Sequence, residues 1–338
     1  MNFNLKSAKS KELGRRRLAN LLALDFATSG IKAVRLRKVK DLMVLAAVDI
    51  LPPCSLESEE PPVLPKPLAA YYTALCATMD NVMLRVFAQT LGEEEEDLEA
   101  LVRENLSAAS DYRVGGQILS RARGKRDSTV LGVAVPEKTV QNYLSLFSSG
   151  APAPHSLELS GLAAFSAFLF TRGSQTENQT ICLIETGARY TYAAFLHRNQ
   201  LQLVNRFDVG GDSLQRQIQT ALGVDADMAG TILSGGSVDV SSPVRQVLNP
   251  FIKQLSIYRE FIERQNKSSL SAIYISGGLA ESTYWQTAIK EVLGSIPQVW
   301  NPFEKIEIPP DIFPENLKGQ ESRFAAAVGA ALAGMEAL

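Results

Sequence analysis

The sequence is poor in the residues that build disulfide frameworks and metal sites. It has three cysteines, Cys54, Cys76 and Cys182, and two histidines, His155 and His197. The cysteines are far apart and match no CxxC or zinc spacing. The histidines lie among proline and serine or at a predicted turn, where surface exposure is the usual outcome. We therefore expect buried free thiols in a reducing compartment and no metal bound through histidine or cysteine.

Long apolar runs and a strong charge excess are also missing. The longest uncharged apolar stretch, Leu159 to Thr171, is shorter than the roughly 17 to 25 residues that a membrane-spanning helix needs. Apolar residues make up 46% of the 338 residues, charged residues make up 21%, and the net charge is −2. This composition predicts a globular chain of at least two domains, with no membrane span and no nucleic-acid partner.

Positive charge does gather at the N-terminus. The first 19 residues contain Glu12 as their one acid and six basic residues: Lys6, Lys9, Lys11, Arg15, Arg16 and Arg17. They lack the continuous apolar stretch of a signal peptide. We predict a basic, flexible tail over residues 1–19, with contact to anionic lipid or to an acidic partner as the alternative to a solvated end.

The most informative feature is a pattern that occurs twice. In the first copy an apolar strand, Leu21–Asp25, ends in an acid and is followed by the small-residue turn Ala27–Gly30. Two more strands are predicted after it, Ile31–Leu36 and Leu42–Leu51, because apolar residues alternate with polar ones or dominate there.

The second copy begins about 160 residues later. Strand Thr180–Ile184 ends in Glu185, and strands Arg189–Leu196 and Leu201–Val209 follow. In both copies 13 residues separate the acid from the hairpin turn. Small residues in such turns leave main-chain N–H groups open to phosphate oxygens, and an acid at the strand end suits Mg²⁺.

A strand-to-helix junction near the C-terminus adds a third element. Ala272–Ile275 is a predicted strand, Ser276–Gly278 is a glycine turn, and Trp285–Leu293 fits a helix. Glycines at such a junction let a phosphate or a flat ring approach the backbone. An isolated Gly-Gly pair is equally compatible with a tight turn.

The segments Leu24–Lys32, Glu185–Ala188 and Ser276–Gly278 together resemble the two phosphate motifs and the adenosine motif of actin-like ATPases. The closer similarity is to the type IV pilus assembly PilM family, relatives of the cell-division protein FtsA, and it covers residues 20–338. Further matches are Val209–Asp212, Asn301–Ile306 and Arg323–Leu332. The resemblance implies an α/β, actin-like (ribonuclease H-like) fold with duplicated domains around a nucleotide cleft and an inserted extra subdomain.

The resemblance also implies roles for single residues. Asp25 would bind Mg²⁺ and Glu185 would be the catalytic acid. The ATP contacts would come from small residues and one lysine: Thr28, Ser29, Gly30, Lys32, Gly187, Ala188, Gly210, Gly211, Gly277 and Gly278. A solvated strand residue is the alternative for Lys32. We interpret Asp212 as a helix cap.

Three positions depart from the family pattern. Ala27 and Leu279 stand where the family usually has glycine, and Glu185 stands where it has aspartate. Ala27 adds a methyl group to the first loop, Leu279 would crowd the base, and Glu185 moves its carboxylate by one methylene. Because a displacement near 1 Å can cost a catalyst about a hundredfold, we expect weak or no hydrolysis. ATP binding is left open.

Residues 82–150 have no counterpart in the second half. The sequence predicts a helix after the acidic run Glu93–Asp97, strands Gln117–Ala122 and Val130–Val135 joined at Gly124–Lys125, and a helix over Glu137–Phe147. The resemblance implies that this extra subdomain helps to bind a cytoplasmic peptide of PilN, a membrane-anchored partner. An exposed sheet edge beside a helix suits such a peptide.

The predicted halves are residues 20–178 and 179–338. Leu157–Phe170 is apolar almost all round and is predicted as a buried helix. A small-residue helix, 323–336, is predicted to pack back on the first half. Leu51–Pro67 is predicted as a loop.

The preferred interpretation is a cytosolic scaffold of type IV pilus assembly, or of a related secretion machine, held at the inner membrane by its partner. One alternative is an active ATPase or phosphotransferase, as in sugar kinases and Hsp70. Another is an FtsA-like filament former, which would be a homo-oligomer. The phosphate loop G-x-x-x-x-G-K-[ST] and the motifs G-x-G-x-x-G and G-x-S-x-G do not occur.

Overall fold

The computed structural model describes residues 19–56, 60–90, 97–121, 128–148, 150–235 and 238–336. The chain divides into two compact units, one made of Met1–Thr171 with Pro302–Leu338 and one made of Arg172–Asn301. The division therefore falls at residue 171, where the sequence pattern had placed it at 178, and the last segment of the chain belongs to the first unit. The predicted basic tail lies outside the described residues, except for Ala19.

The first unit is built on a five-stranded sheet with the order β3-β2-β1-β4-β8. β1 is antiparallel to β2 and parallel to β4, which is in turn parallel to β8. The central strand β1 contains the apolar run Leu21–Leu24 because both of its faces are covered, and Leu21, Leu22 and Leu24 are fully buried. The strands are β1 (Asn20–Ala27), β2 (Gly30–Val39), β3 (Leu42–Leu51), β4 (Tyr72–Ala77) and β8 (Ala153–Leu159).

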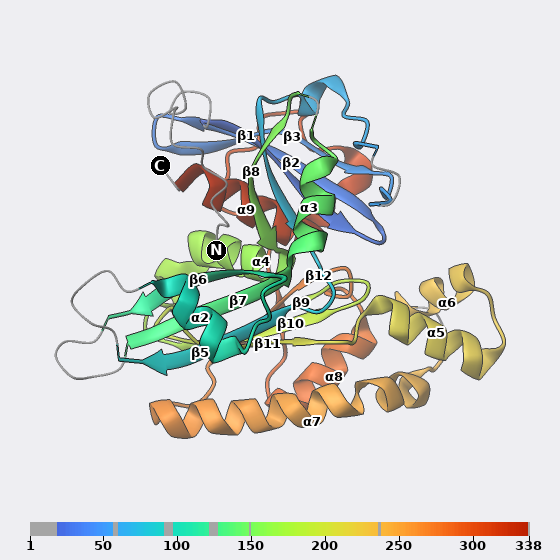
Figure 1. Ribbon diagram of the computed structural model, residues 1–338. Helices are drawn as coiled ribbons and strands as arrows, with labels where there is room; N and C mark the ends of the chain where they lie inside the picture. Colours follow the sequence, from blue (N-terminus) through green and yellow to red (C-terminus); the bar gives the residue numbers. More distant parts are fainter. Residues whose placement is uncertain are drawn as a thin grey trace. The chain divides into compact units, whose positions relative to one another are not determined.

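The same unit contains a second, three-stranded sheet with the order β5-β7-β6. Its strands are β5 (Met83–Gln89), β6 (Tyr112–Ser120) and β7 (Ser128–Pro136). Helix α2 (Leu98–Leu106) lies across this sheet (Figure 1) and inserts Val102 into a core with Phe87 and Val130. Asp97 caps α2 by accepting hydrogen bonds from two backbone N–H groups. The predicted turn at Gly124–Lys125 and the acids Glu93–Glu96 lie outside the described residues.

The second unit repeats the first sheet's order and strand directions, as β11-β10-β9-β12-β13. Its strands are β9 (Thr180–Thr186), β10 (Thr191–His197), β11 (Gln200–Phe207), β12 (Ala272–Gly277) and β13 (Gln298–Val299). Its helices are α5 (Gly211–Leu222), α6 (Ala226–Leu233), α7 (Ser241–Asn266) and α8 (Thr283–Leu293). The two predicted strand-acid-turn patterns thus form the first two strands of two equivalent sheets.

Helices α3, α4 and α9 complete the first unit, and the last residues of α4, from Arg172 on, belong to the second. The predicted helix Leu157–Phe170 is wrong at its start, because Leu157–Leu159 is the end of β8 and α4 spans Ser160–Thr176. Helix α9 (Ala325–Glu336) packs against β1, β2, β4 and β8. Helix α3 (Glu137–Ser145) follows β7, and short 3-10 turns occur at Lys66–Leu68, Glu315–Leu317 and Glu321–Phe324.

All three cysteines are free thiols. Cys76 and Cys182 are buried as predicted, whereas Cys54 is partly exposed because it lies in the loop after β3. Among the described residues, no helix is both long enough and apolar enough to span a bilayer.

Candidate functional site

Asp25 lies near the end of β1 in the first unit and is only 6% exposed. Its Oδ1 accepts a hydrogen bond from Ser160 Oγ at 2.7 Å and a weak one from Cys76 Sγ at 3.7 Å. Burial raises the pKa of Asp25, and Lys32, Ser160 and Cys76 oppose that rise. The carboxyl group is therefore fixed in position by neighbours from β2, β4 and α4.

Lys32 faces Asp25 across the β1–β2 pair. Its side chain is 6% exposed, so the alternative of a solvated strand lysine is wrong. The ammonium group donates to Ser29 Oγ at 2.9 Å and to the Gly30 carbonyl at 3.3 Å. Because Thr28 and Ser29 are exposed, the first predicted loop consists of accessible hydroxyl groups with a buried cation behind them.

A second buried acid lies in the same row of the sheet, and sequence reasoning gave it no role. Cys76 pairs with Asp25 on one side and with Glu158 on the other, so the three residues run across β1, β4 and β8. Glu158 is 1% exposed, and burial raises its pKa to about 7, against the opposing effect of a hydrogen bond from Ser156. The available signal was a lone acid inside an apolar run.

Glu185 occupies the equivalent place in the second unit. It is 9% exposed and pairs with Tyr192 on β10 and Ser276 on β12. Burial raises the pKa of Tyr192, with Arg206 opposing this rise and Glu185 adding to it. The predicted catalytic acid therefore lies beside a buried phenol rather than at an open edge.

The predicted loop residues of the second unit are brought together by backbone hydrogen bonds. Gly187 N–H donates to the Tyr190 carbonyl at 2.9 Å, and Gly211 N–H donates to the Gly187 carbonyl at 3.2 Å. Gly278 N–H donates to the Thr186 carbonyl at 2.8 Å. The predicted loop residues of the second unit thus form one cluster, which these three N–H groups hold together. The cluster consists of Gly187, Ala188, Gly210, Gly211, Gly277 and Gly278.

Gly277 cannot be replaced by a larger residue in this arrangement. Its φ is +91°, and a Cβ atom there would lie 2.3 Å from the Thr186 carbonyl oxygen. Glycine is the residue that accepts both conditions. The predicted Gly-Gly turn is therefore required by the close passage of β12 and β9 at their ends.

The interpretation of Asp212 as a helix cap is wrong. Asp212 does not cap α5, because the helix starts at Gly211 and its cap position is Gly210, whose N–H donates to Ser213 Oγ at 3.1 Å. Leu279 is 8% exposed and belongs to the core around Trp285, and its effect on a bound base stays a prediction. Asp212 N–H instead donates to the Ala188 carbonyl at 2.7 Å.

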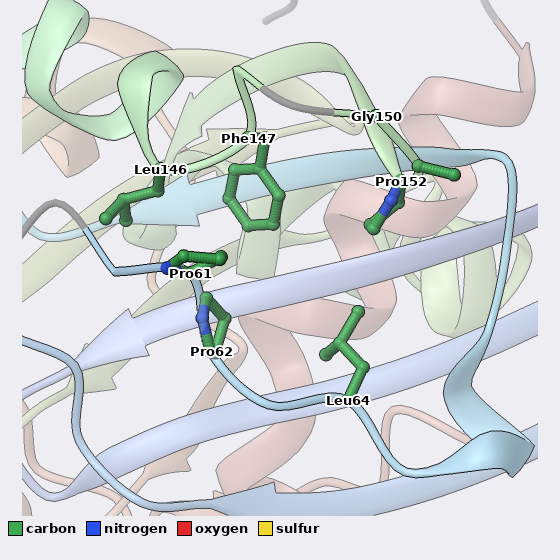
Figure 2. Close-up of a pocket in the computed structure, with 8 residues that line it drawn as sticks. Pro61, Pro62, Leu64, Leu146, Phe147, Gly150 and Pro152 are labelled. Atoms are coloured by element: carbon green, nitrogen blue, oxygen red, sulfur yellow. The ribbon is translucent and has the colours of Figure 1, made fainter.

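The first unit also contains a pocket of about 210 Å³ between the loop after β3 and the segment that joins α3 to β8. Every residue that lines it is nonpolar, and the ring of Phe147 lies between the 61–62 prolines and Pro152 (Figure 2). On its other side Phe147 meets Phe26 edge-on, with ring centroids 6.5 Å apart. The lining residues are Pro61, Pro62, Leu64, Leu146, Phe147, Gly150, Ala151 and Pro152.

Within the described part of the chain, no group of three or more His, Cys, Asp or Glu side chains is arranged to hold a metal ion. Mg²⁺ needs fewer protein ligands, since it keeps several waters and binds nucleotide phosphates. The single acid Asp25, held by Ser160, is compatible with that chemistry. Its assignment to Mg²⁺ stays a prediction.

Residues 119–335 match the sequence family described as type IV pilus assembly protein PilM. The chain is similar to a solved structure described as a PilM-PilN type IV pilus biogenesis complex, with 20% identity and a TM-score of 0.76, covering 93% of this chain and 98% of that one. No curated protein matches.

More distant structures are similar as well. A Bacteroides thetaiotaomicron protein with an actin-like ATPase fold and unknown function has 12% identity and a TM-score of 0.48, covering 85% of this chain and 93% of its own. An activator of a 2-hydroxyisocaproyl-CoA dehydratase from Clostridium difficile, solved with ADPNP, has 12% identity and a TM-score of 0.44, covering 94% and 95%. The predicted fold is confirmed: this is an actin-like ATPase fold with duplicated ribonuclease H-like sheets.

Proposed function

The chain belongs to the type IV pilus assembly protein PilM family, and from this premise we propose that it is a cytosolic scaffold of pilus assembly. In this role it binds the cytoplasmic tail of a PilN-like inner-membrane protein and is held at the membrane through that tail. The similar structure described as a PilM-PilN complex supports this choice of partner.

The observation that carries the proposal is the pocket of the first unit, which is lined by nonpolar side chains and by polar main-chain atoms of the same residues. A cavity near 150 Å³ is large enough to hold a benzene ring, so about 210 Å³ accommodates one large apolar side chain. It is smaller than the roughly 300 to 1,000 Å³ of typical small-molecule sites. The pocket therefore fits the anchor residue of a peptide better than it fits a nucleotide.

The pocket also lies where the predicted peptide-binding segment returns to the main sheet. Leu146 and Phe147 continue directly from α3 and close one side of the pocket, and Leu64 closes another. Prolines at positions 61, 62 and 152 restrict the backbone of the lining loops. Such a surface is pre-formed, and binding to it requires little ordering of the protein.

In this proposal a nucleotide is a ligand of the protein and not its substrate. Asp25 would hold Mg²⁺, and Thr28, Ser29, Gly30 and Lys32 would hold phosphate in the first unit. The Glu185 side chain is one methylene longer than the aspartate usual in the family and lies in register with Tyr192. Three glycine N–H groups of the second unit are already donated to carbonyls. We therefore propose that any bound ATP is turned over weakly or not at all.

Titration of a labelled tail peptide from the organism's PilN-like protein tests the docking site. Leu64→Glu would place a carboxylate in an apolar pocket, which is costly, so we expect binding at least tenfold weaker. Val63→Glu is the matched control, because Val63 is the neighbouring residue, is 89% exposed and does not line the pocket. Fluorescence anisotropy on the full chain gives both affinities.

The control variant should bind within about twofold of the unmodified chain. Equal losses in the two variants would point to a general charge effect and contradict the pocket. Failure of the unmodified chain to bind the peptide would contradict the proposed partner. Circular dichroism of both variants checks that the fold is intact.

A further inference from the structure

The sheet of the second unit carries a row of polar side chains near the ends of its parallel strands. Four residues are aligned by the pairing of β11, β10, β9 and β12: Arg206, Tyr192, Glu185 and Ser276. Residues that are directly paired point to the same face of a sheet. Glu185 and Ser276 are each the second-to-last residue of their strand. Because ligands of such sheets bind beyond the strand ends, the row lies next to the predicted nucleotide loops of this unit.

Tyr192 is a buried member of this row, and its hydroxyl group lacks a hydrogen-bond partner. The side chain is 0% exposed, and its oxygen makes no hydrogen bond within the part of the chain that the structure describes. Arg206 lies close without hydrogen-bond geometry, and it contacts Asp208 at 3.6 Å and the Tyr190 ring at 4.3 Å. A buried hydroxyl without a partner costs stability, so its presence at Tyr192 needs a reason outside the fold.

The equivalent position in the first unit shows what the second unit lacks. Lys32 follows Asp25 by seven residues and pairs with it, as Tyr192 follows Glu185 by seven and pairs with it. The Lys32 ammonium group donates to its own loop, at Ser29 and Gly30. The Tyr192 hydroxyl has no such contact to the described loop of its own unit. The comparison indicates that this hydroxyl serves a group from outside the chain.

The neighbours of the Tyr192 hydroxyl select the chemistry of that group. Burial raises the pKa of Tyr192, and the Glu185 carboxylate is near enough to add to the rise. A bare phosphate is repelled by a carboxylate, whereas Mg²⁺ is attracted by it and keeps several waters. Such waters can donate to a carboxylate oxygen and to a phenol oxygen alike. A hydrated divalent cation therefore fits these two residues.

We infer that the Tyr192 hydroxyl and the Glu185 carboxylate together bind the water shell of the Mg²⁺ that accompanies a nucleotide. The inference rests on the proposed role of the nucleotide as a ligand, and it makes Tyr192 a binding residue of the second unit. The hydroxyl group then lowers the stability of the free protein and contributes affinity in the complex. Neither residue lines the peptide pocket.

Tyr192→Phe tests the inference, because it removes the hydroxyl group and keeps the ring. In calorimetric titration of the full chain with Mg-ATP, we expect the variant to bind at least about fivefold more weakly, as for one lost hydrogen bond. In titration with ATP and EDTA, the two proteins should agree within about twofold. Without ligand, the melting temperature of the variant should be higher by about 2 °C, because the unpartnered buried hydroxyl is gone.

Tyr258→Phe is the matched control within the same unit. The Tyr258 hydroxyl on α7 accepts a hydrogen bond from Asn205 Nδ2 at 2.8 Å. Its removal should therefore lower the melting temperature, in contrast to Tyr192→Phe. We expect the affinity of this control for Mg-ATP to stay within about twofold of the unmodified chain.

Four results would overturn the inference. The first two are no binding of Mg-ATP to the unmodified chain and an unchanged Mg-ATP affinity in Tyr192→Phe. The third is an equal loss of affinity with and without Mg²⁺, which would place the phenol on a phosphate instead. The fourth is a lower melting temperature of ligand-free Tyr192→Phe, which would make the hydroxyl a structural group. Each result leaves the peptide titration with Leu64→Glu unaffected, so it can be told apart from a failure of the docking proposal.

Discussion

Two carboxyl groups are buried in one row of the first sheet, and they differ in their neighbours. Burial raises the pKa of Asp25, but a lysine and a serine hydroxyl close by oppose this rise. For Glu158 the dominant effect is burial, which raises its pKa from 4.5 to about 7. A buried acid of this kind makes stability depend on pH near neutrality.

We predict that Glu158 lowers the stability of the fold as pH rises from about 4.5 to about 7. The folded protein holds this proton more tightly than the unfolded chain does, so the contribution is fully present below the unfolded pKa and is lost through the folded one. A difference of about 2.5 pKa units corresponds to roughly 3 kcal/mol. Urea unfolding at pH 5 and pH 8 measures it.

Glu158→Gln removes the titrating group while keeping its size. The variant should lose about 2.5 kcal/mol less than the unmodified chain between the two pH values, because pH 5 already lies above the unfolded pKa. Glu177→Gln, at an exposed position, should change nothing. An unaltered pH dependence in Glu158→Gln would show that another group carries it.

Single residues were also where sequence reasoning reached its limit. The positions of the acids and glycines could be predicted from the local sequence pattern. In the structure, those of each unit lie together within that unit. Leu279 and Lys32 could not be placed in this way, because whether a side chain at a loop turns inward depends on the core that it meets. Leu279 joins the Trp285 core, and the Lys32 ammonium turns to its own loop.

Among the elements, the two hairpins were predictable because each is specified by contiguous residues. β4 could not be predicted from the sequence. Its six residues do not alternate between apolar and polar, and no acid marks the end of the strand. β8 was read as helix because Leu157–Leu159 continues into the apolar α4 without a turn residue. Short apolar runs do not distinguish a buried strand from a buried helix by periodicity.

Helices α9 and α4 come into close contact at a position where α9 has a glycine, Gly329. A Cβ atom at Gly329 would lie 1.7 Å from the Ala163 carbonyl oxygen, which belongs to the backbone and cannot turn aside. We predict that Gly329→Ala destabilises the fold by about 3 kcal/mol or more, at the upper end of overpacking effects. Chemical denaturation of the purified variant measures the loss.

Gly173→Ala in α4 is the control for that substitution. Its Cβ atom would meet nothing closer than 3.5 Å, and alanine is the better helix former by about 1 kcal/mol. We expect this variant to be as stable as the unmodified chain or slightly more stable. If both alanines proved harmless, the helices would not be in the close contact that the structure shows.

The whole molecule has two sheets of the same order, each with a buried acid in its first strand. The duplication was predictable from the repeated pattern, whereas the return of residues 302–338 to the first unit needed the three-dimensional contacts. In our account the fold serves docking, through the peptide pocket of the first unit. The altered positions Ala27 and Glu185 argue against turnover.

Phosphate release from Mg-ATP by the full chain, with and without saturating tail peptide, tests this account most directly. Calorimetric titration with Mg-ATP, beside an Asp25→Ala control, shows in parallel whether nucleotide is bound. We predict that the peptide binds and that phosphate release stays at the buffer background in both conditions. Peptide-stimulated release that disappears in Glu185→Ala would contradict the account and make the chain an ATPase activated by its partner.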